Sequence, residues 1–234
     1  MLKEELIKRS PLRIFKESIR GGLEGGELGL VASLSGIGKT SVLVQIGLDK
    51  LLRGQKIIHV SFTRHNDYVL AWYEDIFDEF IKKKNLENEQ YVKNEILRNR
   101  VLMRFTQEGL STEQILRSLK AMIRDGNFNA ETVIIDGYDF SAKGREHIEL
   151  VKAFAVEMGL SFWYSCNVDG EKQNYNSSNI PILIEDYVNL FDVVVVLVPK
   201  TNHVNLAISK DRETLNPEHK GLKLDPRTLL ILEN

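Results

Sequence analysis

The chain alternates between short apolar runs and longer stretches whose apolar residues recur at helical spacing. The short runs are typical of buried strands, and the longer stretches carry the single apolar stripe of a packed helix. This alternation predicts a mostly parallel sheet with helices on both faces, because parallel strands need helical crossovers. Strands are expected at 27–32, 57–62, 101–105, 132–136, 160–166 and 192–198, and helices at 42–51, 68–82, 111–124, 144–158 and 181–190.

The two ends of the chain depart from this alternation. Residues 1–20 are rich in charge and predict an N-terminal helical segment. Beyond the last parallel strand, further strands are expected without helices between them, which predicts a C-terminal antiparallel extension. We therefore expect a three-layer α/β domain over residues 21–234. The strands of its extension are expected at about 203–209, 222–224 and 228–232.

The most specific chemical signal is the segment 33–40, SLSGIGKT, which we call the glycine loop. It matches the phosphate-binding pattern G-x-x-x-x-G-K-[ST] except that Ser33 replaces the first glycine. Backbone N–H groups of such a loop converge on an anion at the start of the next helix. Lys39 is expected to reach the β- and γ-phosphates, and the Thr40 hydroxyl to bind Mg²⁺. A surface loop that merely precedes a lysine is the alternative, and the flanking strand and helix argue against it.

A Mg²⁺ site beside this loop needs an acidic residue at the end of a neighbouring strand. Asp136 ends the strand predicted at 132–136, and ligands bind at the carboxyl ends of strands in open α/β sheets. Thr40 and Asp136 are the candidate metal ligands, and the alternative for Asp136 is a turn residue. The expected nucleotide-binding residues run from the loop into the helix: Ser35, Gly36, Ile37, Gly38, Lys39, Thr40 and Ser41.

Hydrolysis would need one more group, which orients or deprotonates the attacking water. The expected carboxylate should follow the strand at 57–62, but Thr63 and Arg64 stand there. Asp139, close to Asp136, is another candidate. Loss of such a base leaves binding intact and slows the chemistry by roughly two to four orders of magnitude.

Together these residues resemble the RecA-like P-loop ATPases and, within them, the KaiC-like branch. The lead-in GGLEGGELGLV at 21–31, the glycine loop and the strand ending at Asp136 follow in that family's order. The segment ISKDRET at 208–214 is similar to the family's K-x-R-x-[ST] segment. The resemblance implies that Lys210 and Arg212 reach the nucleotide on a neighbouring subunit and offset charge during phosphoryl transfer. An ordinary charged hairpin is the alternative for these two residues.

The resemblance also implies a function. It implies ATP and Mg²⁺ as cofactors and, as partner, either a homo-oligomeric ring such as a hexamer or a related protein. It favours an ATP-binding assembly or signalling switch whose hydrolysis is weak or absent, since Thr63-Arg64 replaces the family's catalytic glutamates. On this interpretation the candidate catalytic residues are Lys39, Lys210 and Arg212.

Two other functions stay open on the residues alone. A DNA recombination or repair ATPase of the RecA family would place the polar segment 169–179 against DNA. That segment offers only Lys172 and Tyr175 for backbone and base contacts. A module that has lost nucleotide binding is the other possibility, and the retained lysine, hydroxyl and carboxylate argue against it.

Composition narrows the class of protein. The 234 residues suit one α/β domain, and a net charge of −2 gives no electrostatic footprint for nucleic acid or an acidic membrane. The single cysteine, Cys166, excludes an internal disulfide framework and a cysteine-based zinc site. We find neither a signal-peptide core nor an apolar run near the roughly 18 residues of a membrane span. We therefore expect a cytoplasmic protein without membrane contact.

Overall fold

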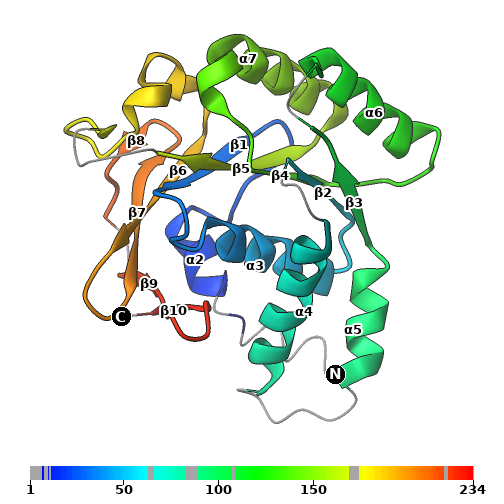
Figure 1. Ribbon diagram of the computed structural model, residues 1–234, viewed down its shortest axis with the longest axis horizontal. Coiled ribbons are helices and arrows are strands. Elements are labelled where there is room, and N and C mark those ends of the chain that lie inside the picture. The colour runs from blue at the N-terminus through cyan, green and yellow to red at the C-terminus, as the bar shows by residue number, and fades with distance from the viewer. Residues whose placement is uncertain are drawn as a thin grey trace.

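The computed structural model describes residues 7, 10, 12–62, 66–82, 89–106, 109–168, 174–218 and 221–233. Strands and helices alternate as far as β6, except that two helices, α4 and α5, lie between β2 and β3, and strands follow one another thereafter (Figure 1). The helices are α2 (Leu12–Ser18), α3 (Lys39–Leu52), α4 (Asn66–Lys82), α5 (Glu89–Leu97), α6 (Thr112–Arg124), α7 (Phe140–Met158) and the 3₁₀ helix η2 (Ile182–Leu190). The strands are β1 (Leu28–Ser33), β2 (Ile57–Ser61), β3 (Arg100–Arg104), β4 (Thr132–Asp136), β5 (Ser161–Asn167), β6 (Val193–Pro199), β7 (Val204–Asp211), β8 (Thr214–Leu215), β9 (Leu222–Leu224) and β10 (Ile231–Glu233).

All these described strands belong to one sheet. Their spatial order is β10-β9-β7-β6-β1-β5-β4-β2-β3, with β8 paired to β7. Neighbours from β6 to β3 run parallel, whereas β7 pairs antiparallel with β6, β8 and β9, and β9 with β10. The predicted α/β class, mostly parallel sheet and antiparallel C-terminal extension are therefore confirmed.

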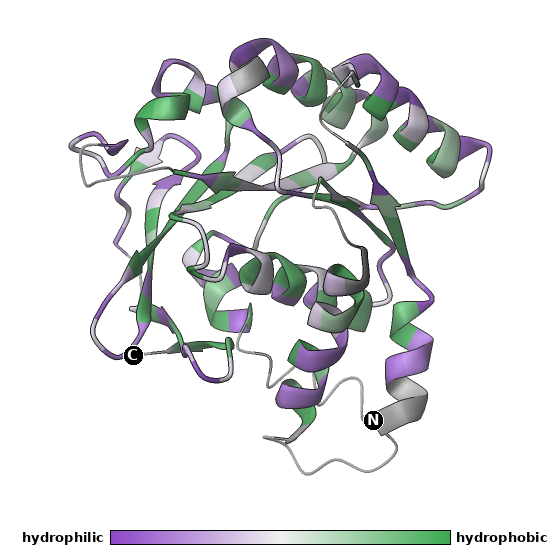
Figure 2. Cartoon of the chain, viewed as in Figure 1, coloured by the Kyte–Doolittle hydropathy of each residue, from purple (hydrophilic) through white to green (hydrophobic). Residues whose placement is uncertain are grey.

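Helices cover both faces of the sheet and give three layers. Figure 1 shows α6 and α7 on one face and α2 to α5 on the other. Because successive strand side chains point to opposite faces, β5 sends Trp163 into one hydrophobic core and Phe162 and Tyr164 into the other. The helix sides that face the sheet are the hydrophobic ones (Figure 2). Within the described ranges, no helix combines the length and apolar run needed to cross a membrane.

Some element boundaries differ from the predicted ones. The predicted start of α6 is confirmed, with Ser111 and Gln114 forming a capping box. The helix expected from residue 144 begins instead at Phe140, because the Asp139 side chain accepts a hydrogen bond from the Ser141 N–H (2.9 Å) and caps it. The helix expected at 181–190 is the 3₁₀ helix η2.

The C-terminal extension is fastened to α3, the helix that follows the glycine loop. The Leu229 carbonyl accepts hydrogen bonds from Ser41 Oγ (2.8 Å) and Gln45 Nε2 (2.9 Å). The Ile231 N–H donates to Gln45 Oε1 (2.9 Å). The Gln45 amide thus pairs with this segment as a neighbouring strand would, and it joins α3 to the C-terminal extension.

A buried polar cluster lies between the sheet and α4. His59 is fully buried, and its Nδ1 lies 3.1 Å from the Tyr73 hydroxyl. The guanidinium of Arg100 stacks over the Tyr73 ring at 4.3 Å. Burial lowers the pKa of His59 from 6.5 to about 4. The Arg100 charge also lowers this pKa, by less, and the Asp136 charge opposes both effects. His59 is therefore neutral in the folded protein at neutral pH.

This shift predicts a loss of stability in acid. Above pH 6.5 His59 is neutral in both states, but between pH 6.5 and about 4 only the unfolded state takes up its proton. The free energy of unfolding should fall across this window by up to about 3 kcal/mol from His59 alone. Urea unfolding at several pH values should show a steeper decline for the native protein than for His59→Gln. Equal slopes would contradict the buried neutral state.

Candidate functional site

The glycine loop connects the carboxyl end of β1 to the start of α3. Gly36 and Gly38 have φ values of 78° and 112°, in the left-handed region that favours glycine. Ser33 is the last residue of β1 and is fully buried. Its backbone is that of a strand, so a side chain is tolerated where the phosphate-binding pattern has its first glycine. The two glycines that the loop retains are the ones its backbone requires.

Alanine substitutions should distinguish two reasons for glycine here: the left-handed backbone at both positions and the close approach of Leu224 at Gly38. At Gly36 a Cβ atom would meet open space, whereas at Gly38 it would lie 2.6 Å from Leu224 Cδ2. Left-handed backbone costs a residue with a Cβ atom about 1–2 kcal/mol. We expect Gly36→Ala to lower the free energy of unfolding by about that amount, and Gly38→Ala by about 1 kcal/mol more. Equal losses in urea titrations would show that the Leu224 contact is unimportant.

The Lys39 side chain folds back into the loop. Its Nζ donates hydrogen bonds to the carbonyls of Leu34 (2.8 Å) and Ser33 (3.1 Å) and to Ser33 Oγ (3.2 Å). The residue is buried. The ammonium therefore lies where an anion held by the loop would meet it. The hydroxyl of Ser33, which sequence reasoning treated as a minor departure, contributes one of these acceptors.

The start of α3 offers hydrogen-bond donors to a ligand. Gly38 is the N-cap residue, and no side chain caps the helix there. The N–H groups of a first helical turn have no acceptors within the helix, and they form the positive end of its dipole. Ser41 can contribute only such a backbone group, because its buried hydroxyl donates to Leu229.

The structure brings the two predicted metal ligands together. Thr40 Oγ1 donates a hydrogen bond to Asp136 Oδ2 at 2.8 Å, which joins the start of α3 to the end of β4. The other carboxylate oxygen, Oδ1, accepts a hydrogen bond from Ser165 Oγ on β5. Sequence reasoning missed Ser165, although a polar residue near the end of a predicted strand was a signal for it.

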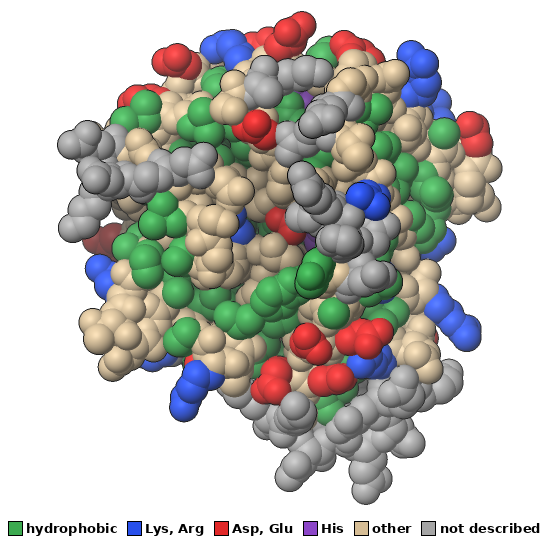
Figure 3. All heavy atoms as spheres, viewed as in Figure 1, with side chains coloured by type: hydrophobic (Ala, Val, Ile, Leu, Met, Phe, Trp, Pro, Cys, Tyr) green, Lys and Arg blue, Asp and Glu red, His purple; other side chains and the backbone are tan. Residues whose placement is uncertain are grey.

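An open cleft of about 520 Å³ lies at the carboxyl ends of β4 and β5, where Gly137 and Asn167 line it. Asn167 pairs with Ser33, the first residue of the glycine loop, across β5 and β1. The face in Figure 3 carries a band of hydrophobic side chains across its middle and charged ones towards its rim. The carboxyl edge of the sheet therefore has room for a ligand larger than a phosphate ion.

Lys210 lies far along β7 from this edge. Its partner in the antiparallel pair is Val194, near the start of β6, so it sits towards the amino ends of the parallel strands. Lys210 is buried, and its Nζ donates to the Phe191 carbonyl. Burial lowers its pKa, although Asp192 opposes the shift. Within this chain, Lys210 lies at the amino ends of the parallel strands, whereas the glycine loop lies at their carboxyl ends.

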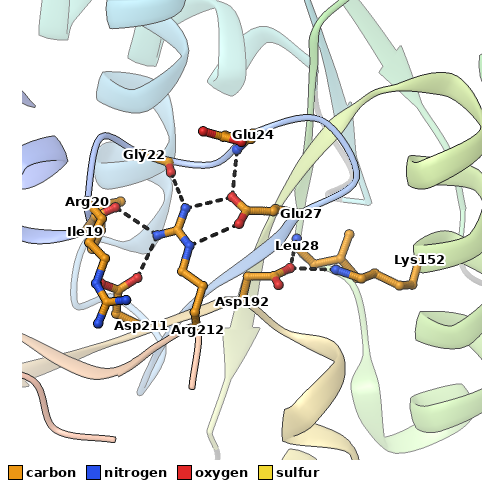
Figure 4. A network of polar contacts seen from close by, with 10 residues as sticks. All are labelled: Ile19, Arg20, Gly22, Glu24, Glu27, Leu28, Lys152, Asp192, Asp211 and Arg212. Carbon is orange, nitrogen blue, oxygen red and sulfur yellow. Dashed lines mark hydrogen bonds and ion pairs between the residues drawn. The ribbon is translucent and has the colours of Figure 1, made fainter. Parts of the chain in front are cut away.

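Arg212 is held by contacts within the chain, which Figure 4 shows. Nε and Nη2 form a forked pair with the Glu27 carboxylate (3.0 and 2.8 Å). Nη2 also donates to the Gly22 carbonyl (2.7 Å), and Nη1 donates to the Ile19 carbonyl (2.9 Å) and Asp211 (2.6 Å). Burial alone would lower the pKa of Arg212, but the bonds to Asp211 and Glu27 outweigh it and raise the pKa. All the donor nitrogens are engaged, so the guanidinium clasps the lead-in segment to β7.

The predicted action of Lys210 and Arg212 across a subunit interface stays a prediction. Thr63 and Arg64, which stand in place of the expected base, lie outside the described residues. Asp139, the other candidate base, caps α7: its carboxylate accepts from the N–H and hydroxyl of Ser141. That role explains the residue without catalysis.

A scan against models of known protein families and a search of curated proteins returned no match to this chain. The geometry of the loop and its neighbours therefore carries the functional proposal.

Proposed function

We propose that this chain is an ATP- and Mg²⁺-binding protein of the RecA-like P-loop class, most similar to its KaiC-like branch. It would act as a nucleotide-dependent assembly or signalling switch. The observation that carries the proposal is the set of groups at the carboxyl edge of β1 and β4: two left-handed glycines, the uncapped start of α3, the buried Lys39 ammonium and the Thr40–Asp136 pair.

The loop suits a polyphosphate for electrostatic reasons. A phosphate at the start of α3 would receive first-turn N–H groups and the positive end of the helix dipole. The Lys39 ammonium already donates hydrogen bonds to oxygen acceptors, the carbonyls of Ser33 and Leu34. Binding would exchange these neutral acceptors for charged ones, and charge-assisted hydrogen bonds are the stronger kind.

The Thr40 and Asp136 oxygens fit Mg²⁺. This cation prefers hard oxygen ligands and is usually bound through one or two carboxylates together with substrate phosphates and water. When bound, Mg²⁺ would neutralise phosphate charge. Among the described residues, no cluster of three or more His, Cys, Asp and Glu side chains forms a separate metal site. The hydroxyl–carboxylate pair is therefore the site that we assign to the cation.

Assembly and slow turnover complete the proposal. The absence of a carboxylate at Thr63-Arg64 supports weak or absent hydrolysis. Association into a homo-oligomeric ring, or with a related protein partner, would depend on whether the chain holds nucleotide. A direct role for Arg212 across that interface would require its internal hydrogen bonds to open. Acidic side chains gather over α4 in Figure 3, which favours a protein partner over nucleic acid on that side.

Thermal unfolding with and without ATP–Mg²⁺ tests this proposal. A ligand present at 100 times its Kd and bound only by the folded state adds about 2.7 kcal/mol of stability. For a chain of this size that corresponds to a rise in Tm of roughly 5–10 °C. Phosphate release, measured on the same samples, should stay near background. An unchanged Tm at millimolar ATP–Mg²⁺ would contradict nucleotide binding, and rapid release abolished by Lys39→Ala would contradict slow turnover.

A further inference from the structure

Ser165 makes two hydrogen bonds at the end of β4. Its hydroxyl accepts from the Gly137 N–H at 2.8 Å and donates to Asp136 Oδ1 at 2.6 Å. The residue is 2 % exposed, so water does not compete for these bonds. Because the Gly137 N–H can only donate, it occupies a lone pair of the hydroxyl and leaves the Ser165 proton directed at the carboxylate. The hydroxyl therefore has one stable orientation.

This contact fixes the orientation of the Asp136 carboxylate. Oδ1 is held by Ser165, and Oδ2 receives the Thr40 hydroxyl at 2.8 Å. The terminal torsion of an aspartate is broad, so without a fixed partner its two oxygens are free to rotate. With Ser165 in place, Oδ2 is the oxygen presented to α3. The chain of contacts from Ser165 through Asp136 to Thr40 joins β5, β4 and α3.

We propose that Ser165 is a positioning residue that sets the Asp136 carboxylate for a divalent cation shared with Thr40. The inference rests on the proposed binding of ATP and Mg²⁺. Partners of this outer kind orient metal-binding carboxylates, and their loss typically weakens metal binding by 10–100-fold. Ser165 would act on the cation only through Asp136.

The same two strands provide a matched control. At their opposite ends, Thr132 Oγ1 lies 2.8 Å from Ser161 Oγ, and both residues are buried. Ser161→Ala therefore removes a hydroxyl of β5 that faces β4, as Ser165→Ala does, but without contact with Asp136. If the lost hydroxyl affects only the stability of the protein, Ser161→Ala and Ser165→Ala should behave alike. A change in metal requirement should appear only when Ser165 is changed.

The test is a Mg²⁺ titration of ATP binding, followed by calorimetry, with ATP binding in EDTA as the metal-free reference. We expect Ser165→Ala to raise the Mg²⁺ concentration for half-maximal binding by about 10-fold or more and to leave the affinity in EDTA unchanged. Ser161→Ala should leave both quantities unchanged. Ser165→Cys, which keeps a side chain of the same shape but has only a weak donor, should behave as Ser165→Ala and serves if the alanine variant does not fold.

The outcomes distinguish the positioning role of Ser165 from the proposed binding of ATP. A Mg²⁺ midpoint for both Ser165 variants equal to that of Ser161→Ala would overturn the positioning role while leaving nucleotide binding intact. Equal losses of ATP affinity with and without Mg²⁺ would also overturn it, because they would indicate general damage to the site. No binding of ATP by the unaltered protein, with or without Mg²⁺, would overturn the proposed function and this inference with it.

Discussion

Replacing Lys39 with alanine is expected to lower the affinity for ATP–Mg²⁺ by roughly 100-fold or more. Hydrogen bonds to charged groups contribute about 1.5–3 kcal/mol each, and the Lys39 ammonium would serve two phosphate groups. Lys39 is buried among the acceptors of the glycine loop. It is the one basic residue in the loop sequence SLSGIGKT, so no other side chain of the loop can replace its charge. Calorimetric titration of the native and Lys39→Ala proteins measures the difference.

The matched control for this variant is Lys120→Ala. Lys120 is half-exposed on α6 and pairs with Glu157 at the surface. Its loss removes the same formal charge without touching the loop, so ATP affinity should stay within about twofold of the native value. If Lys39→Ala bound ATP–Mg²⁺ as tightly as Lys120→Ala, the glycine loop would not be the phosphate site.

Replacing Arg212 with alanine is expected to give the largest loss of stability among the variants proposed. Removal of one partner from a buried, hydrogen-bonded ion pair costs about 3–5 kcal/mol. Arg212 keeps a side-chain exposure of 20 %, so we expect the lower end, about 3 kcal/mol, and a fall in Tm of roughly 6–12 °C. Besides the Glu27 charge, the Gly22 carbonyl would lose the Arg212 donor, and the Ile19 carbonyl would keep only the Gly22 N–H. Urea unfolding and calorimetry measure both quantities.

Arg13→Ala provides the comparison. Arg13 forms an exposed pair with Glu17 on α2, and its loss should change the free energy of unfolding by less than about 0.5 kcal/mol. If Arg212→Ala were as stable as Arg13→Ala and yet failed to assemble with ATP–Mg²⁺, the guanidinium would act across a subunit interface. The clasp between the lead-in segment and β7 would then be incidental.

The features that the sequence predicted well depend on local pattern. Strand β4 lies at its predicted bounds because four apolar or β-branched residues precede Asp136 within one short run. The glycine loop was visible because its demands are local: left-handed backbone at Gly36 and Gly38, then a lysine and a hydroxyl at the start of a helix. Such signals need no knowledge of which strands are neighbours.

The features that were missed depend on contacts between distant segments. Helix α7 begins at Phe140, before the predicted start at 144, so Gly144 lies inside the helix. In the structure a Cβ atom there would lie 2.5 Å from the Tyr187 hydroxyl, so the glycine serves packing against η2. Local pattern could not reveal this, because Tyr187 lies more than one element away in sequence.

The same limit applies to the site. Ser165 reaches Asp136 only because β5 lies beside β4, and strand order is not encoded in the periodicity of either strand. The bonds of Arg212 require the backbone to turn two carbonyls towards it, that of Gly22 in the lead-in segment and that of Ile19 just before it. From the sequence, the family resemblance implies a role for Arg212 at a subunit interface. No local pattern indicates its contacts within the chain.

Native mass spectrometry of the unaltered protein, mixed with ATP and Mg²⁺, shows whether the chain binds an intact nucleotide. We predict that each chain carries one intact nucleotide with magnesium, that Lys39→Ala carries none, and that higher assemblies increase when nucleotide is added. Chains that stay free of nucleotide at millimolar ATP–Mg²⁺ would rule out the proposed function, whatever their state of assembly.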